Sequence, residues 1–149
     1  MELETFGWDV DGDGIAHAVF DVPGRSMNTL TAKAVADIIA ISKEVASNDA
    51  IKGLVISSGK PSGFCAGADL GEMNQSAGAG KSPADMSEAE LKKAQFDRGF
   101  SLNKTLRELE TCGKPVAVAL NGLALGGGLE VALACHYRVA ANDNPKLQF

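Results

Sequence analysis

The chain has 149 residues, of which 45% are hydrophobic and 22% charged, and its formal net charge is -5. This length and composition suit a globular protein with a hydrophobic core of its own. The acidic balance argues against a general nucleic-acid-binding protein, which needs clustered Lys and Arg against backbone phosphates, but it is compatible with a small anionic ligand held by backbone N–H groups.

The first part of the sequence predicts two strands, a helix and a third strand. Residues 3–8 and 15–22 read as strands joined by a hairpin, because the Asp-Gly-Asp-Gly run between them supplies the backbone angles of a tight turn. Thr31 can cap a helix at 32–46, whose apolar residues recur at helical spacing. The short apolar run at 53–58 is typical of a buried strand in a parallel sheet.

The second part continues this alternation. Ser87 and Glu90 fit a capping box at the start of the long helix. Strands that alternate with helices imply β-α-β crossovers, so we expect an α/β fold, and no linker divides residues 1–149 into two domains. The predicted elements are a loop running into a short helix (63–73), a flexible loop (74–83), a long amphipathic helix (87–109), a strand (115–120), a glycine-rich turn (121–128), a helix (129–134) and a strand (137–141).

Three cysteines, Cys65, Cys112 and Cys135, are odd in number and widely spaced, which fits neither a disulfide framework nor a CxxC metal site. We therefore expect buried free thiols in a reducing compartment. The acidic N-terminus has no features of a signal or transit peptide, and no run of about 18 apolar residues predicts a transmembrane helix. The sequence thus predicts a cytoplasmic protein that contacts neither membrane nor nucleic acid.

Two stretches of the sequence resemble ligand-binding motifs but lack a residue that each motif requires. The acidic run at 9–14 resembles the start of an EF-hand loop, but Phe20 occupies the twelfth position, where calcium needs a bidentate Glu. The three glycines at 126–128 do not form a dinucleotide-binding fingerprint, because Val131 stands where the third glycine would be. We therefore predict no metal site and no cofactor.

Two segments carry the chemistry. Residues 62–70 (SGFCAGADL) and 121–130 (NGLALGGGLE) each follow a predicted strand and lead into a helix. Backbone N–H groups at such turns can donate to an oxyanion, and Glu130 lies in the first turn of the second helix. Taken singly, each segment is better explained as a tight turn, with Glu130 as an acid stabilised by the helix dipole; their combination points to a site.

That combination resembles the crotonase superfamily, also called the enoyl-CoA hydratase/isomerase family. FCAGADL and NGLALGGGLEVALACHYRVAA are similar to its two signature stretches, and PGRSMNTLT to its substrate loop. The DVPGRSMNTL run most resembles the N-terminal hydratase portion of bifunctional fatty-acid oxidation alpha subunits. The resemblance implies a spiral of β-β-α units, of which this chain would form the N-terminal part.

The resemblance also assigns roles. The backbone N–H groups of Ala68 and Gly127 would hold the thioester oxygen, and Glu130 would be the first of two glutamates that hold one water and exchange the α-proton. Arg25 could contact phosphate or pantetheine, or could be simply exposed to solvent. The implied contacts with the acyl-CoA substrate are Arg25, Met27, Ala66, Gly67, Ala68, Asp69, Leu70, Gly126 and Gly127.

In the family a Gly-x-Pro-Glu turn carrying the second glutamate would follow Phe149, so we expect a fragment that is inactive alone. The implied function is syn hydration of 2-enoyl-CoA in fatty-acid β-oxidation, with CoA as part of the substrate and no separate cofactor. A homotrimer or a multienzyme β-oxidation complex is the expected assembly. The alternative is a non-catalytic acyl-CoA-binding or assembly module, complete at Phe149.

Overall fold

A computed structural model describes residues 1–72 and 86–149, with the backbone alone for 94–101. The flexible loop predicted at 74–83 lies outside the described residues. The elements are β1 (Phe6–Val10), β2 (Ile15–Phe20), α1 (Ala32–Ser47), β3 (Gly53–Ser58), β4 (Gly63–Cys65), α3 (Glu88–Glu110), β5 (Val116–Leu120), β6 (Leu123–Ala124), α4 (Gly127–Ala134) and β7 (Tyr137–Ala140).

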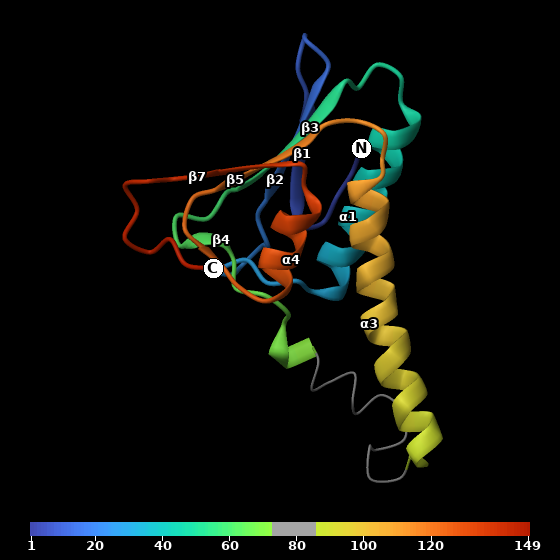
Figure 1. Ribbon diagram of the computed structural model, residues 1–149. Helices are drawn as coiled ribbons and strands as arrows, with labels where there is room; N and C mark the ends of the chain where they lie inside the picture. The colour runs from blue at the N-terminus through green and yellow to red at the C-terminus, as the bar shows by residue number, and fades with distance from the viewer. Residues whose placement is uncertain (73–85) are drawn as a thin grey trace.

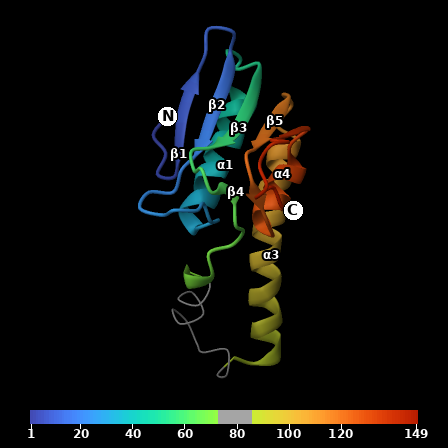
Figure 2. The same ribbon diagram turned by 90° about the vertical axis from the view of Figure 1, so that its left-hand side faces the viewer.

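The main sheet has five strands in the order β1-β2-β3-β5-β7 (Figure 1). The predicted hairpin pairs β1 and β2 antiparallel, and every other neighbouring pair is parallel. Parallel neighbours need crossover connections, which α1, α3 and α4 provide. The expected α/β architecture is therefore confirmed, and the first half of α3 extends beyond the rest of the described fold (Figures 1 and 2).

One face of the sheet is covered by the three helices. The register aligns Ala16, Leu54 and Val116 across three strands, and all three side chains are buried. Residues one position along each strand point the other way: Val55 is partly buried and Tyr137, on the edge strand, is 67% exposed. The core thus lies between the sheet and α1, α3 and α4.

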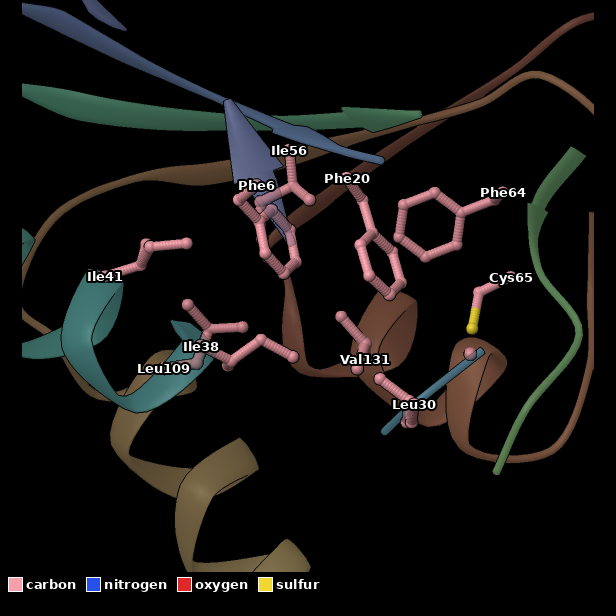
Figure 3. A pocket seen from close by; sticks show the side chains of 11 residues that line it. Phe6, Phe20, Leu30, Ile38, Ile41, Ile56, Phe64, Cys65, Leu109 and Val131 are labelled. Atoms are coloured by element: carbon pink, nitrogen blue, oxygen red, sulfur yellow. The ribbon is translucent and has the colours of Figure 1, made fainter. Parts of the chain in front are cut away.

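Aromatic rings fill the centre of this core. Phe6 stacks on Phe20 with ring centroids 4.4 Å apart, and Phe64 meets Phe20 edge-on at 6.4 Å. In Figure 3 these rings face Ile38 and Val131 from the helices. The remaining internal void has a volume of about 10 Å³, no more than a single water would need, so the core is close-packed.

A second, two-stranded parallel sheet pairs β4 with β6, where the sequence predicted only loop and turn. Strands of two or three residues carry no periodicity from which they could be recognised. Gly63 makes the pairing possible: its φ is +143°, and a Cβ there would lie 2.6 Å from the amide nitrogen of Leu123. This small sheet holds residues 62–70 and 121–130, the two signature segments, side by side.

The predicted capping residues of α1 and α3 are confirmed. The Thr31 side chain accepts a hydrogen bond from the Ala34 N–H, and Ser87 and Glu90 form the predicted capping box of α3. The helix predicted at 129–134 begins two residues earlier, at Gly127. That difference places Gly127 at the first helical position, where a backbone N–H has no partner within the helix.

Candidate active site

The two signature segments meet at the N-terminus of α4. The Leu125 N–H donates to the Cys65 carbonyl over 3.0 Å, which continues the β4–β6 pairing toward the helix. A Cβ on Gly67, whose φ is +99°, would lie 2.9 Å from the Leu125 oxygen and 3.6 Å from the Gly127 nitrogen. Only a residue without a side chain permits this approach, so Gly67 brings the two predicted donors together.

The first predicted donor, the Ala68 N–H, is oriented by its neighbours. Leu30 donates its N–H to the Gly67 carbonyl over 2.8 Å and accepts from the Asp69 N–H over 3.2 Å, forming a parallel bridge centred on Ala68. In such a bridge the central residue directs its own N–H away from the partner strand. Within the described part of the chain, the Ala68 N–H has no acceptor.

The second predicted donor, the Gly127 N–H, is the first of α4. Two of the following N–H groups do have acceptors: the Gly128 N–H donates to the Leu125 carbonyl over 2.9 Å, and the Glu130 N–H donates to the Gly126 carbonyl over 3.0 Å. No acceptor takes up the Gly127 N–H among the residues that the structure describes. The positive end of the α4 dipole lies behind it, so this N–H is suited to an anionic oxygen.

Both donors line one pocket with Glu130. The pocket has a volume of about 450 Å³, and Glu130 supplies the one carboxylate among its lining residues in the described chain. The Glu130 Oε2 atom would lie 3.8 Å from a Cβ built on Gly127, so the carboxylate and the donors share one end of the pocket. The other lining residues are Leu30, Ala32, Val35 and Leu102.

Arg25 and Asp69, both predicted to contact CoA, bind each other. The Arg25 guanidinium donates to the Asp69 carboxylate, which is only 5% exposed. Thr29 donates its hydroxyl to the same oxygen over 3.0 Å, and the Glu72 N–H donates to the other over 2.9 Å. The pKa of Asp69 lies below its ordinary value, chiefly because of the hydrogen bond from the Glu72 N–H. The contact of Arg25 and Asp69 with CoA stays a prediction.

The other predicted substrate contacts are not all gathered at this pocket. Met27 lines a separate hollow of about 340 Å³ together with Ser62 and Lys146. Leu70 is 72% exposed, and Ala66 donates its N–H to Asn28 over 2.9 Å. Met27, Ala66 and Leu70 are therefore not among the residues that line the pocket, and their contact with the substrate stays a prediction.

Sequence reasoning missed the apolar wall of the pocket, Leu30, Val35 and Leu102. Val35 falls on the apolar stripe of α1, and that periodicity is the signal that pointed to it as core. Leu30 also lines the core shown in Figure 3, so it separates the core from the pocket. Leu102 is distant in the sequence from Leu30 and Val35, and only the fold brings the three residues to one pocket.

Asn28 holds the loop behind the pocket and was not singled out as a structural residue. It is completely buried, and its amide donates to the carbonyls of Phe20 over 2.8 Å and Phe64 over 3.1 Å. Its side-chain oxygen accepts from the Val22 N–H over 2.9 Å. Asn28 thereby joins the ends of β2 and β4 to the segment that carries Leu30.

No cluster of three or more His, Cys, Asp or Glu side chains arranged to bind a metal ion occurs in residues 1–72 and 86–149. No helix in the same part of the chain is long and apolar enough to cross a membrane.

The chain is similar in sequence to two curated alpha subunits. It is 40% identical over 141 residues to the fatty acid oxidation complex subunit alpha of Shewanella amazonensis, a match that covers 95% of this chain and 18% of that protein. With the same subunit of Idiomarina loihiensis it is 40% identical over 143 residues, covering 96% and 18%. The chain therefore spans about a fifth of the length of these relatives.

Solved structures share its fold. The enoyl-CoA hydratase of Bacillus anthracis superposes with a TM-score of 0.69 at 26% identity, covering 91% of this chain and 47% of that one. The enoyl-CoA hydratase of Shewanella pealeana, at 21% identity and a TM-score of 0.76, covers 93% and 47% and supports the fold alone. The expected crotonase-type α/β fold is confirmed. Residues 11–148 match the family model for enoyl-CoA hydratase/isomerase, and the chain belongs to that family.

Proposed function

We propose that this protein hydrates 2-enoyl-CoA thioesters in fatty-acid oxidation. The observation that supports this most is the meeting of the Ala68 and Gly127 N–H groups, which have no acceptor among the described residues, with the carboxylate of Glu130 at one pocket. That arrangement suits a reaction in which negative charge develops on a thioester oxygen next to a carbon that gains a proton.

In the proposed reaction the thioester oxygen accepts hydrogen bonds from the Ala68 and Gly127 N–H groups. A carboxylate takes a proton from water as the water oxygen bonds to the β-carbon, and the double-bond electrons move onto the thioester oxygen as an enolate. A carboxyl group then gives a proton to the α-carbon as the enolate collapses to the thioester carbonyl, so that H and OH have added across the double bond. The two donors stabilise the enolate, and each such donor is typically worth about 3 kcal/mol in the transition state. The apolar wall formed by Leu30, Val35 and Leu102 suits the acyl chain.

Glu130 is the proposed acid–base group. Its place in the first turn of α4 puts it beside the Gly127 donor, within reach of a water or α-proton on a bound thioester. Hydration through two carboxylates needs a second group, and we propose that it comes from the half of the hydratase fold that this chain does not span. Isomerisation of the double bond would use the same enolate site.

The substrate contacts proposed beside the pocket are Met27, Ala66, Gly67, Leu70 and Gly126, with the CoA moiety as part of the substrate and no separate cofactor. We propose a cytoplasmic protein, in keeping with three free cysteines. Assembly as a homotrimer or within a multienzyme β-oxidation complex is proposed from the family and from the names of the relatives.

The test is hydration of crotonyl-CoA, followed as loss of enoyl absorbance, on a sample whose intact mass has been measured. Turnover of crotonyl-CoA by the whole protein is the result we expect. Acyl-CoA binding by the whole protein without any turnover would favour the alternative, a non-catalytic acyl-CoA-binding or assembly module. That alternative draws support from Glu130 being the one carboxylate on the pocket in the described chain.

A further inference from the structure

The carboxylate of Asp69 belongs to the residue after the proposed donor Ala68, but Asp69 is not among the residues that line the pocket. It is 5% exposed and accepts three kinds of donor: the Arg25 guanidinium, the Thr29 hydroxyl at 3.0 Å and the Glu72 N–H at 2.9 Å. A negative charge one residue from an enolate would oppose the reaction unless it were neutralised. Arg25 supplies that counter-charge.

These bonds fix the backbone on both sides of Ala68. Thr29 immediately precedes Leu30, whose N–H and carbonyl form the two bonds that flank Ala68. The hydroxyl of Thr29 and the N–H of Glu72 therefore clamp Asp69 from the strand before it and the turn after it. The plane of the peptide that carries the Ala68 N–H has little freedom left.

The same contacts extend to the other wall of the pocket. The Glu72 carboxylate accepts the Ala32 N–H over 2.7 Å at the start of α1. Ala32 lines the pocket that Ala68 and Glu130 share. One chain of hydrogen bonds thus runs from Arg25 through Asp69 and Glu72 to the first turn of α1.

We propose that Asp69 is a positioning residue: with Arg25 as its counter-ion and Thr29 as its second donor, it holds the Ala68 N–H in the direction in which it binds the thioester oxygen. Arg25 is then part of the site's scaffold and not a phosphate contact. This inference rests on the proposed enolate site. Its consequence is that loss of the Asp69 charge weakens enolate stabilisation more than ligand binding, because the apolar wall and Gly127 are untouched.

The test uses acetoacetyl-CoA, a thioester whose enolate absorbs in the near ultraviolet, so the enolate fraction of bound ligand reports the two donors without needing turnover. We expect Asp69→Asn to lower that fraction about 10-fold while the Kd changes by less than about threefold. Thr29→Val, which removes one donor to the carboxylate, should give an intermediate loss. Asp49→Asn is the matched control, since Asp49 is exposed beyond the end of α1.

The outcomes separate the two proposals. No enolate signal from the wild-type protein that binds acetoacetyl-CoA would contradict the proposed function itself. A wild-type signal that Asp69→Asn leaves unchanged, in a variant that folds and binds, would overturn the positioning role. If Asp69→Asn does not fold, Thr29→Val and Arg25→Met decide the question: loss of enolate with binding retained supports the role, and an unchanged enolate fraction overturns it.

Discussion

Gly128 packs against Cys65 so closely that no side chain fits between them. A Cβ on Gly128 would lie 2.6 Å from the Cys65 carbonyl oxygen and 2.7 Å from its Cβ. Both atoms belong to the buried strand β4 and cannot move aside as the end of a flexible side chain could. This contact sets the distance between the strand that precedes Ala68 and the helix that begins at Gly127.

Gly128→Ala should therefore destabilise the protein by about 1–3 kcal/mol, because the added methyl group must push α4 away from β4. Urea denaturation followed by circular dichroism measures the loss. Gly12→Ala is the control, since a Cβ on Gly12 meets nothing within 4 Å and its φ is not positive. Equal stabilities for the two variants would show that the contact is not as tight as described.

Asn28→Leu should lower the free energy of unfolding by about 3 kcal/mol or more. Leu has a similar volume but leaves the Phe20 and Phe64 carbonyls and the Val22 N–H without the partners that Asn28 gives them. Asn103→Leu, at an exposed position of α3, should stay within about 0.5 kcal/mol of the wild type in the same denaturation experiment. A small effect at Asn28 would mean that water replaces its hydrogen bonds.

Acid should weaken the hydrogen bonds that the Asp69 carboxylate accepts from Arg25, Thr29 and the Glu72 N–H. The pKa of its carboxyl is lowered in the fold, chiefly by the Glu72 N–H, so the ionised group stabilises the folded state above its ordinary pKa, and this contribution is lost as the pH falls through the lowered value. The difference in unfolding free energy between the wild type and Asp69→Asn should be constant above about pH 5 and shrink below about pH 4. A difference that grows on acidification would contradict the assignment.

The buried thiols should resist alkylation. Burial raises the pKa of Cys135 to about 12 and raises that of Cys65 above its usual range, and only the thiolate reacts with iodoacetamide. In the native protein at about pH 8, peptide mass spectrometry should find both unmodified, whereas unfolded protein should be labelled at all three cysteines. Rapid labelling of native Cys135 would show that α4 opens readily.

Local signals in the sequence predicted most of the elements. The bounds of β3 and the capping residues Thr31, Ser87 and Glu90 agree with the structure because each depends on neighbours within a few residues. The same is true of the two glycine-rich segments, whose backbone chemistry is visible in their residues. The site donors Ala68 and Gly127 came from family resemblance, and the structure adds where their N–H groups lie.

Contacts between distant residues could not be predicted. Arg25 and Asp69 are 44 positions apart, so the sequence gives no sign of the bond between them. Their contact with the substrate, which the family resemblance implies, stays a prediction. The pairing of β4 with β6 likewise depends on how the rest of the fold brings them together. The part of the site that sequence reasoning missed is the part made by tertiary packing.

Glu130 is proposed to act on a thioester held by Ala68 and Gly127, and the decisive measurement is steady-state hydration of crotonyl-CoA by Glu130→Gln. The matched control is Glu88→Gln, which also removes a carboxylate from the first turn of a helix, at the start of α3, the end that extends away from the rest of the described fold. In the whole protein we predict that Glu130→Gln lowers kcat at least about 100-fold with a modest change in KM, while Glu88→Gln leaves both unchanged. Near-normal turnover by a folded Glu130→Gln protein would contradict the account.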